Sequence, residues 1–251
     1  MLIAQISDTH ILEPRDEHPA GRLRAECLTR CVADINRQEP DAVVLTGDTV
    51  QHGSPEEYER LRELLAPLEA PLYLVPGNRD DNSALAAAFS DLDYLPTDSE
   101  CLHYEIDEFE CRLVAIDSTA EGERKGVFGP SRQERLDAVL SAAPDRPTLL
   151  FIHHPPFDVG DHYTNGYRRT PEAQALADIV SRHPQAIALL CGHVHCQVER
   201  DWAGTRAIVM PSVAIDVRKG IDENEAQGTP IYLLHSVTNG GRLSTQQARA
   251  A

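Results

Sequence analysis

The amino-acid sequence predicts an α/β (α+β) fold, and three observations support that class. Short apolar runs alternate with amphipathic helical stretches along most of the chain, a pattern typical of layered folds with parallel strands. The 251 residues are 41% hydrophobic, which is enough to bury a large core. Two stretches, 101–117 and 196–237, are instead rich in strand-forming residues and suggest a second sheet packed on the first. We expect one domain over 1–251, in which the C-terminal β-rich part 197–240 completes the second sheet.

The strands are predicted from short apolar runs that polar or turn-forming residues bound. In the alternating part of the chain these runs lie at 2–6, 42–45, 72–75, 148–152 and 187–190. In the β-rich stretches we expect strands at 102–106, 113–117, 197–201, 207–210 and 231–237. The tail from Asn239 is polar, so we expect it to end at the surface.

The helices are predicted from apolar periodicity and from start signals. Apolar residues recur every four positions from Leu23 to Ile35. A Ser followed three residues later by Glu forms a capping box at Ser54 and again at Ser131. Thr170 followed by a proline is a further helix start. The helices predicted in this way lie at 22–38, from 54 onward, at 131–142 and at 170–182.

Charge and composition exclude several classes of function. Lys and Arg number 23 against 40 Asp and Glu, a formal net charge of −17, so we expect no nucleic-acid polymer as partner. No apolar run approaches the ~18 residues of a membrane span, so we expect no membrane partner. The start at Met1 lacks a signal-peptide pattern, and we expect a cytoplasmic protein. Six sparse cysteines do not make a disulfide framework and are expected to be reduced.

Polar side chains follow five of the predicted strands, at the point where each strand ends. They are Asp8 and His10, Asp48 after Gly47, Asn78 after Gly77, His153 with His154, and His193 with His195. Ligands of α/β sheets bind outside the carboxyl ends of the strands, so we expect these groups at one edge. Residues two apart, such as Asp8 and His10, would face the same way on an extended stretch.

These residue types are those of a transition-metal site. Carboxylate, amide and imidazole groups without a thiolate favour Fe, Mn, Co or Zn over a soft-metal site. The seven candidate ligands are Asp8, His10, Asp48, Asn78, His153, His193 and His195. Seven are too many for one ion, whereas two ions about 3.5–4 Å apart would use them all. Asp48, at a strand end after a glycine, suits the bridging position.

Each motif alone has a simpler explanation. Gly47-Asp48 alone is usually a turn, and the His153-His154-Pro155-Pro156 run alone could be a rigid strand exit. An isolated Asp-x-His pair is often surface chemistry or a cap. Five such motifs in order, each at the end of an apolar strand, favour the metal site.

As an ordered set, the motifs resemble the calcineurin-like metallophosphoesterase superfamily. The segments Ile6–His10, Gly47–Tyr58 and Leu72–Asn78 look like the branch of bacterial glycerophosphodiesterases and class III cyclic-nucleotide phosphodiesterases. The resemblance implies a four-layer α-β-β-α sandwich of two mixed sheets flanked by helices. It also implies a dinuclear centre, with Asp8, His10, Asp48 and His195 on one metal and Asp48, Asn78, His153 and His193 on the other.

The activity that the resemblance implies is hydrolysis of small phosphodiesters by a metal-bridging hydroxide. The expected substrates are glycerophosphodiesters or 3',5'-cyclic nucleotides, and the expected catalytic residues are Asp48, Asn78, Arg79 and His195. A phosphomonoesterase or pyrophosphate-bond hydrolase on the same centre stays an alternative. A non-catalytic scaffold is a more remote one, because all seven ligand positions are present.

Arg79 departs from the family pattern, which usually has His at this position of the third motif. An arginine cannot act as a general acid, but its planar fork can bind phosphate oxygens. The alternative is a substituted residue paired with Asp80 or Asp81.

We expect substrate to be bound by Asn78, Arg79, His154, Tyr163 and Arg168. Tyr163 and Arg168 lie in the insert 158–170, whose polar and aromatic residues suit a lid over the site. The acidic loop 216–228 would also border the site. We expect the apolar strand Ile231–Leu234 at a sheet edge, where it would need covering, and therefore expect a homo-oligomer, a dimer or higher.

Overall fold

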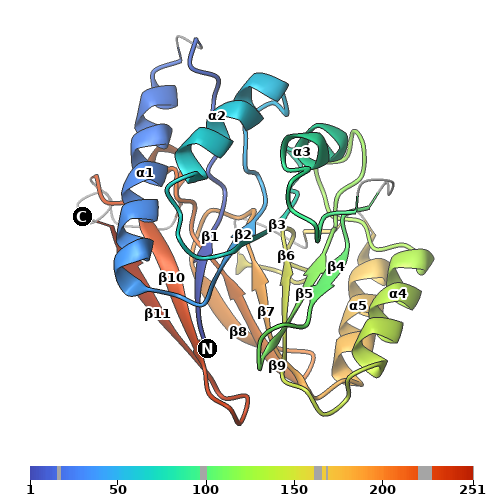
Figure 1. Cartoon of the computed structure of the whole chain (residues 1–251). Coiled ribbons are helices and arrows are strands. Elements are labelled where there is room, and N and C mark those ends of the chain that lie inside the picture. Colours follow the sequence, from blue (N-terminus) through green and yellow to red (C-terminus); the bar gives the residue numbers. More distant parts are fainter. Residues whose placement is uncertain (16–17, 97–100, 161–165, 168, 220–227, 251) are drawn as a thin grey trace.

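Two β-sheets lie face to face between two groups of helices in the computed structural model (Figure 1). The structure describes residues 1–15, 18–96, 101–160, 166–167, 169–219 and 228–250. Helices α1 (Ala20–Gln38) and α2 (Pro55–Leu65) cover the first sheet, and α4 (Pro130–Ser141) and α5 (Thr170–Ser181) cover the second. The four layers confirm the predicted α-β-β-α sandwich.

The first sheet has five strands in the order β11-β10-β1-β2-β3. Strands β1, β2 and β3 are parallel, and β10 and β11 join them in antiparallel pairs. The strands span Leu2–Ile6 (β1), Ala42–Thr46 (β2), Leu72–Val75 (β3), Ile231–Val237 (β10) and Leu243–Arg249 (β11).

The second sheet has six strands in the order β4-β5-β6-β7-β9-β8. Its four central strands are parallel, and an antiparallel strand lies at each edge, so both sheets are mixed. The strands span Tyr104–Ile106 (β4), Arg112–Ile116 (β5), Thr148–Ile152 (β6), Ala186–Cys191 (β7), Val198–Trp202 (β8) and Thr205–Val209 (β9).

Successive side chains of a strand face opposite sides of its sheet, so the core has two parts. In β6, Leu149 and Phe151 pack in the larger cluster between the sheets, whereas Leu150 and Ile152 pack in the cluster under α4 and α5. Successive side chains of a strand point to opposite faces, so a strand buried on both sides must be apolar throughout. This requirement explains why β6 reads as a continuous apolar run and was recognisable in the sequence.

The expected role of 197–240 is only half right. Strands β8 and β9 belong to the second sheet, but β10 pairs with β1 in the first sheet. The polar tail forms β11, which pairs with β10 along its whole length at the edge of the first sheet. The segment Ile231–Leu234 is therefore an interior strand, and the exposed edge from which we inferred an oligomer does not exist.

Two further differences concern helices. Helix α4 begins at Pro130 with Gly129 as its N-cap, and no side chain caps it, so the capping box expected at Ser131 is wrong. A short helix α3 (Asn82–Ala88), capped by Asp81, was not predicted. The capping box at Ser54 is confirmed, with both reciprocal hydrogen bonds to Glu57.

Within the ranges that the structure describes, no helix is both long and apolar enough to cross a membrane.

Candidate metal centre

The five polar motifs meet where the strand ends of the two sheets come together, not at the edge of one sheet as expected. Those after β1, β2 and β3 come from the first sheet, and those after β6 and β7 come from the second. Hydrogen bonds join the two sets: His153 Nδ1 donates to the Thr46 carbonyl at 2.7 Å, and Gln5 Nε2 donates to the Cys191 carbonyl at 3.1 Å. The contact between the sheets therefore assembles the site.

One group of side chains comprises Asp8, His10, Asp48 and His195. One ligand atom from each lies within 4.8 Å of the others. The Nε2 atoms of His10 and His195 are 3.1 Å apart, and His195 Nε2 lies 3.2 Å from Asp8 Oδ1. These are the four residues that the resemblance assigns to one metal.

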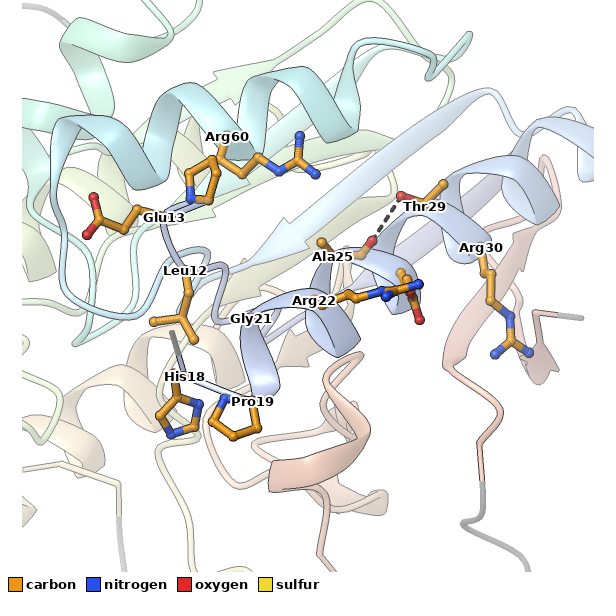
Figure 2. Close-up of a pocket in the computed structure, with 12 residues that line it drawn as sticks. Leu12, Glu13, His18, Pro19, Gly21, Arg22, Ala25, Thr29, Arg30 and Arg60 are labelled. Atoms are coloured by element: carbon orange, nitrogen blue, oxygen red, sulfur yellow. Dashed lines mark hydrogen bonds and ion pairs between the residues drawn. The ribbon is translucent and has the colours of Figure 1, made fainter. Parts of the chain in front are cut away.

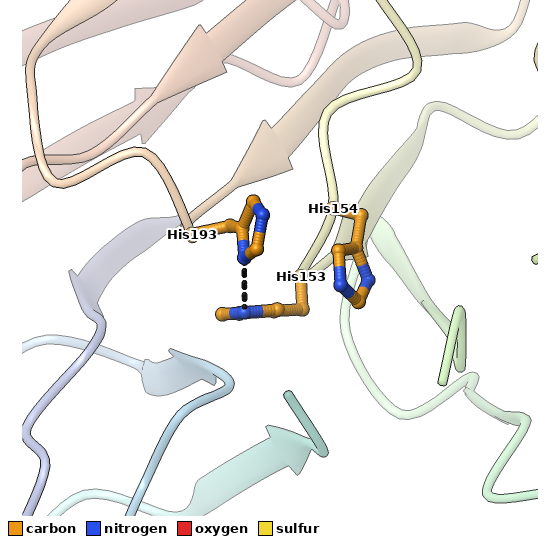
Figure 3. A group of neighbouring side chains, drawn as sticks. All are labelled: His153, His154 and His193. Atoms are coloured by element: carbon orange, nitrogen blue, oxygen red, sulfur yellow. Dashed lines mark hydrogen bonds between the residues drawn. The ribbon is translucent and has the colours of Figure 1, made fainter. Parts of the chain in front are cut away.

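The second group centres on His153 and His193, which point toward one another in Figure 3. His193 Nδ1 lies 3.1 Å from His153 Nε2. His154 lies beside them, but both its ring nitrogens are engaged, one with the Ser118 hydroxyl at 2.8 Å and one with the Arg124 carbonyl at 3.2 Å. His154 is therefore a poor candidate for a ligand, although it lies close enough to be grouped with the other two histidines.

Asp48 lies between the two groups. Its Oδ2 is 3.8 Å from His10 Nε2, and its Oδ1 is 3.4 Å from His153 Nε2. The backbone N–H of Arg79 donates to Oδ1 at 2.8 Å and fixes the carboxylate. A carboxylate that presents one oxygen to each group has the arrangement of a bridging ligand.

Asn78 completes the fit to a metal ion. Its Oδ1 is buried and has no hydrogen-bond partner among the residues that the structure describes. A buried polar atom without a partner costs free energy, and a cation is one partner that would satisfy an amide oxygen. The donor set of carboxylate, amide and imidazole, together with this unpaired oxygen, fits divalent transition-metal ions.

Hydrogen bonds from outside the site orient two of the imidazoles. His153 Nδ1 donates to the Thr46 carbonyl at 2.7 Å, and His195 Nδ1 donates to the Val217 carbonyl at 3.0 Å. Each bond keeps a proton on Nδ1, so Nε2 is the nitrogen that faces the site and would bind a metal ion once its own proton is released. Metal-binding histidines are commonly held in this way.

The backbone at the site is unusual. Seven non-glycine residues have positive φ among those described, and five of them are candidate ligands: Asp8, His10, Asp48, His193 and His195. Such conformations cost free energy and concentrate at functional sites. The ligands therefore do not lie on extended backbone, and the reason we gave for Asp8 and His10 facing the same way is wrong.

Two glycines allow the motifs to approach closely. A Cβ atom on Gly77 would lie 2.2 Å from the Asp48 backbone nitrogen and 2.4 Å from its Oδ1. A Cβ on Gly192 would lie 2.1 Å from Ser7 Oγ and 2.7 Å from Asp8 Oδ2. Any larger residue would displace the carboxylates.

The pKa values of the carboxyl and imidazole groups at the site are shifted by burial and by their neighbours. Burial alone would raise the pKa of Asp8 and Asp48, but the neighbouring imidazoles outweigh it and lower both below the ordinary value of 3.8. Burial lowers the pKa of His10 to about 4 and that of His193 well below 6.5. Burial also opposes the charged form of His153, but the Asp48 carboxylate raises its pKa to about 9. The site thus combines anionic carboxylates with two imidazoles, His10 and His193, whose neutral form burial favours. The carboxylates favour the protonated form of His153 and His195, so metal binding would have to release protons from them.

Arg79 stands at the exposed margin of the site. Asp80, its expected alternative partner, is bound instead by the Gly77 and Thr49 backbone N–H groups and by the Thr49 and Tyr58 hydroxyls. Asp81 caps α3. The guanidinium of Arg79 makes no hydrogen bond or ion pair with any residue that the structure describes.

Asp80 makes contacts beside the site that the sequence did not suggest. It joins the loops after β2 and β3, which carry Asp48 and Asn78. Burial, with the nearby Asp48 charge, raises its pKa to about 6. Its position two residues after Asn78 in the third motif was the available signal. Tyr163 and Arg168, expected in a lid, lie outside the described residues.

A cavity of about 700 Å³ lies along the outer face of α1 (Figure 2). Its lining includes Arg22, Ala25 and Thr29 of α1 and Arg60 of α2. None of the seven candidate ligands lines it, so it is separate from the metal centre.

Comparisons with known proteins identify the family of this chain. The family model described as calcineurin-like phosphoesterase matches residues 1–197. A probable glycerophosphodiester phosphodiesterase of Arcobacter nitrofigilis is 32% identical over 252 residues, covering 98% of this chain and 92% of the relative. A 3',5'-cyclic adenosine monophosphate phosphodiesterase of Pseudomonas aeruginosa is 29% identical, covering 99% and 90%.

Among solved structures, a dimetal phosphatase of Danio rerio superposes with a TM-score of 0.77 at 16% identity, covering 100% of this chain and 96% of that one. That likeness concerns the fold. The family match and the full-length relative confirm the resemblance inferred from the motifs. This chain belongs to the calcineurin-like phosphoesterase family.

Proposed function

We propose that the protein is a metal-dependent phosphodiesterase that hydrolyses small phosphodiesters, either glycerophosphodiesters or 3',5'-cyclic nucleotides. The observation that carries this proposal is the convergence of six of the seven candidate ligands, which form two groups with Asp48 between them. The names of two relatives with nearly full-length similarity, which describe a glycerophosphodiester and a cyclic-nucleotide phosphodiesterase, support the substrate class.

The proposed cofactor is a pair of divalent transition-metal ions drawn from Fe, Mn, Co or Zn. Asp8, His10, Asp48 and His195 would hold one ion, and Asp48, Asn78, His153 and His193 would hold the other. Bound there, the ions would lower the pKa of water and neutralise charge on the phosphate oxygens. The protein's part is to orient the ligands and, through the Thr46 and Val217 carbonyls, to turn Nε2 of His153 and of His195 towards the site.

Arg79 is the proposed phosphate-binding residue of the chain itself. Its backbone N–H is bonded to Asp48 Oδ1, so residue 79 is adjacent to the bridging carboxylate. Its guanidinium is exposed and could form two parallel hydrogen bonds to a phosphate group. This contact would stabilise the charge that develops on the non-bridging oxygens during hydrolysis.

His154 does not replace the missing motif histidine as a proton donor. Its two nitrogens are engaged by Ser118 and Arg124. Burial, with the charge of His153, lowers its pKa to about 3, so the ring is neutral at pH 7. We therefore expect diesters with acidic alcohols to be hydrolysed faster than those with alkyl leaving groups.

A substrate panel on metal-restored protein tests this function. We expect turnover of glycerophosphocholine, of cyclic AMP or of both, and turnover of bis(p-nitrophenyl) phosphate well above that of p-nitrophenyl phosphate. Preference for the monoester or for a pyrophosphate bond would favour the alternative hydrolase. Bound metal without turnover of any phosphoester would leave only the scaffold.

The cytoplasmic location and the homo-oligomer stay predictions. The oligomer was expected because β10 was placed at a sheet edge, and β11 pairs with β10 there instead. Light scattering at micromolar concentration decides it: a mass near 27.7 kDa would show a monomer.

A further inference from the structure

Arg24 occupies an unusual place on α1. The helix packs its apolar stripe, including Cys27, Leu28 and Cys31, against the first sheet, and Arg24 lies one turn before these residues. Its side chain is only 7% exposed. A buried guanidinium is stable only when it is paired and its hydrogen bonds are satisfied.

The partner of Arg24 is Asp216, 192 positions later in the sequence. The guanidinium donates through Nη2 and Nε to both oxygens of the Asp216 carboxylate, at 2.8–3.2 Å. Its remaining nitrogen, Nη1, donates to the His10 carbonyl at 3.1 Å and to Gln51 Oε1 at 2.8 Å. Arg24 thus connects the backbone of a metal-ligand residue to the C-terminal part of the chain.

Asp216 belongs to the 3-10 helix η2 (Ile215–Val217), which holds a second ligand. The Val217 carbonyl accepts the Nδ1 proton of His195 at 3.0 Å, and the backbone N–H of Lys219 donates to the His195 carbonyl at 2.9 Å. Just before η2, Ser212 Oγ donates to the Asp8 carbonyl at 2.7 Å. The segment 212–219 therefore contacts two of the four residues of the first ligand group.

These contacts form a closed ring. Arg24 bonds to the His10 backbone, the His10 and His195 rings meet at 3.1 Å, His195 bonds to Val217, and Asp216 bonds back to Arg24. No bond of Arg24 or Asp216 reaches the second ligand group within the described residues. We propose that the Arg24–Asp216 ion pair is a positioning device for one of the two metal sites, setting the approach of His10 to His195. This inference rests on the proposed metal centre.

The same helix offers a matched control. Arg22, two residues earlier, forms an i,i+4 ion pair with Glu26, but its side chain is 90% exposed and the pair touches no ligand. Replacing Arg22 removes the same charge from the same helix. A general effect of charge or helix stability would appear in both variants, whereas an effect on the metal site would appear only at Arg24.

The test measures Mn²⁺ binding in the absence of any substrate. Calorimetric titration of metal-free protein, with metal analysis after dialysis, gives the number of ions and their affinities. We expect two ions in the unaltered protein and in Arg22→Gln. In Arg24→Gln and in Asp216→Asn we expect one ion to bind 10–100-fold more weakly and the other to be unchanged. Arg24→Lys, which keeps the charge without the fork, should recover part of the loss.

A second substitution identifies which ion is affected. The resemblance assigns Asn78 to the second ion only, so Asn78→Ala should weaken that ion, and adding Arg24→Gln should then leave no tight site. Two ions of unchanged affinity in both Arg24→Gln and Asp216→Asn would overturn the inference and leave the metal centre standing. Equal weakening of both ions would also overturn it. If the unaltered protein bound no Mn²⁺, the metal centre and the inference would fail together. Should Arg24→Gln not fold, Asp216→Asn decides alone.

Discussion

The Nε2 atoms of His10 and His195 lie 3.1 Å apart although the two residues are 185 positions apart in the sequence. One follows β1 of the first sheet, and the other follows β7 of the second. Two imidazoles with facing lone pairs repel each other unless a proton or a cation lies between them. A metal ion between these two imidazoles would therefore stabilise the contact between the strand ends of the two sheets.

Removal of metal should lower thermal stability. Ions bound only by the folded chain stabilise it by mass action, by about 2.7 kcal/mol at a free metal concentration one hundred times Kd. We expect a chelator to lower the melting temperature and added Mn²⁺ or Zn²⁺ to restore it. Calorimetry with verified metal content checks this, and an unchanged melting curve after complete metal removal would contradict it.

Asp48→Asn should lower metal content and activity together. The substitution removes the negative charge that both groups share, while the amide keeps the shape of the side chain. We expect loss of at least one ion per chain and a fall in turnover on the order of 10³-fold. Asp91→Asn, which removes an exposed carboxylate, is the control. Two bound ions and normal turnover in Asp48→Asn would exclude the bridging role.

Gly77→Ala should disturb the site without adding or removing a charge. The new Cβ would lie 2.2 Å from the Asp48 backbone nitrogen, so the loops after β2 and β3 must separate. We expect destabilisation by about 1–3 kcal/mol, together with weaker metal binding. The matched control is Gly129→Ala, where a Cβ would meet nothing within 4 Å. Equal behaviour of the two variants in denaturant and metal titrations would show that the close approach is unimportant.

The residue at position 79 should affect both the rate of hydrolysis and how that rate depends on the leaving group. Arg79→Ala removes a phosphate contact and should lower turnover by on the order of 10²-fold on nitrophenyl and alkyl diesters alike. Arg79→His introduces a group that titrates near pH ~6.5. It should raise relative rates on alkyl diesters and add a basic limb to the pH–rate profile. Near-normal rates for Arg79→Ala on both kinds of ester would show that Arg79 takes no part.

Stability should fall in acid partly because of His235. This residue is fully buried between Gln5 and Thr245, and burial lowers its pKa from 6.5 to about 3. Between those pH values the unfolded chain binds a proton that the folded chain does not, so stability decreases as the pH falls. The contribution is about 1.4 kcal/mol per pH unit.

His235→Gln removes this contribution. We expect the variant to be less stable than the unaltered protein at pH 7.5 but to lose stability less steeply between pH 6.5 and 4.5. Urea unfolding at several pH values measures the difference in slope. Parallel slopes would show that His235 is not the source.

The candidate ligands could be identified from the sequence because each follows an apolar strand at a recognisable motif. Asp8, Asp48 and His153 could be recognised from their residue type and from the apolar strand that precedes each of them. The orientation of the side chains could not be predicted, because it depends on left-handed backbone at Asp8 and Asp48. Such conformations are maintained by the surrounding contacts and leave no periodic trace in the sequence.

Contacts between residues far apart in the sequence could not be predicted either. Strand β11 has the mixed polar sequence of an edge strand, and only its partner β10 defines it as a strand. Placing β10 in the second sheet followed from its position after β9, but the chain crosses back to β1. The Arg24–Asp216 pair joins residues 192 positions apart, and neither residue shows in the sequence that it has a buried partner.

The most direct test of the central claim is the rate of bis(p-nitrophenyl) phosphate hydrolysis measured against the amount of Mn²⁺ returned to metal-free protein. We expect no turnover without metal and full activity once two ions are bound per chain, with p-nitrophenyl phosphate a much poorer substrate. Equal turnover in metal-free and metal-loaded protein, or no turnover of the diester with two ions bound, would contradict it.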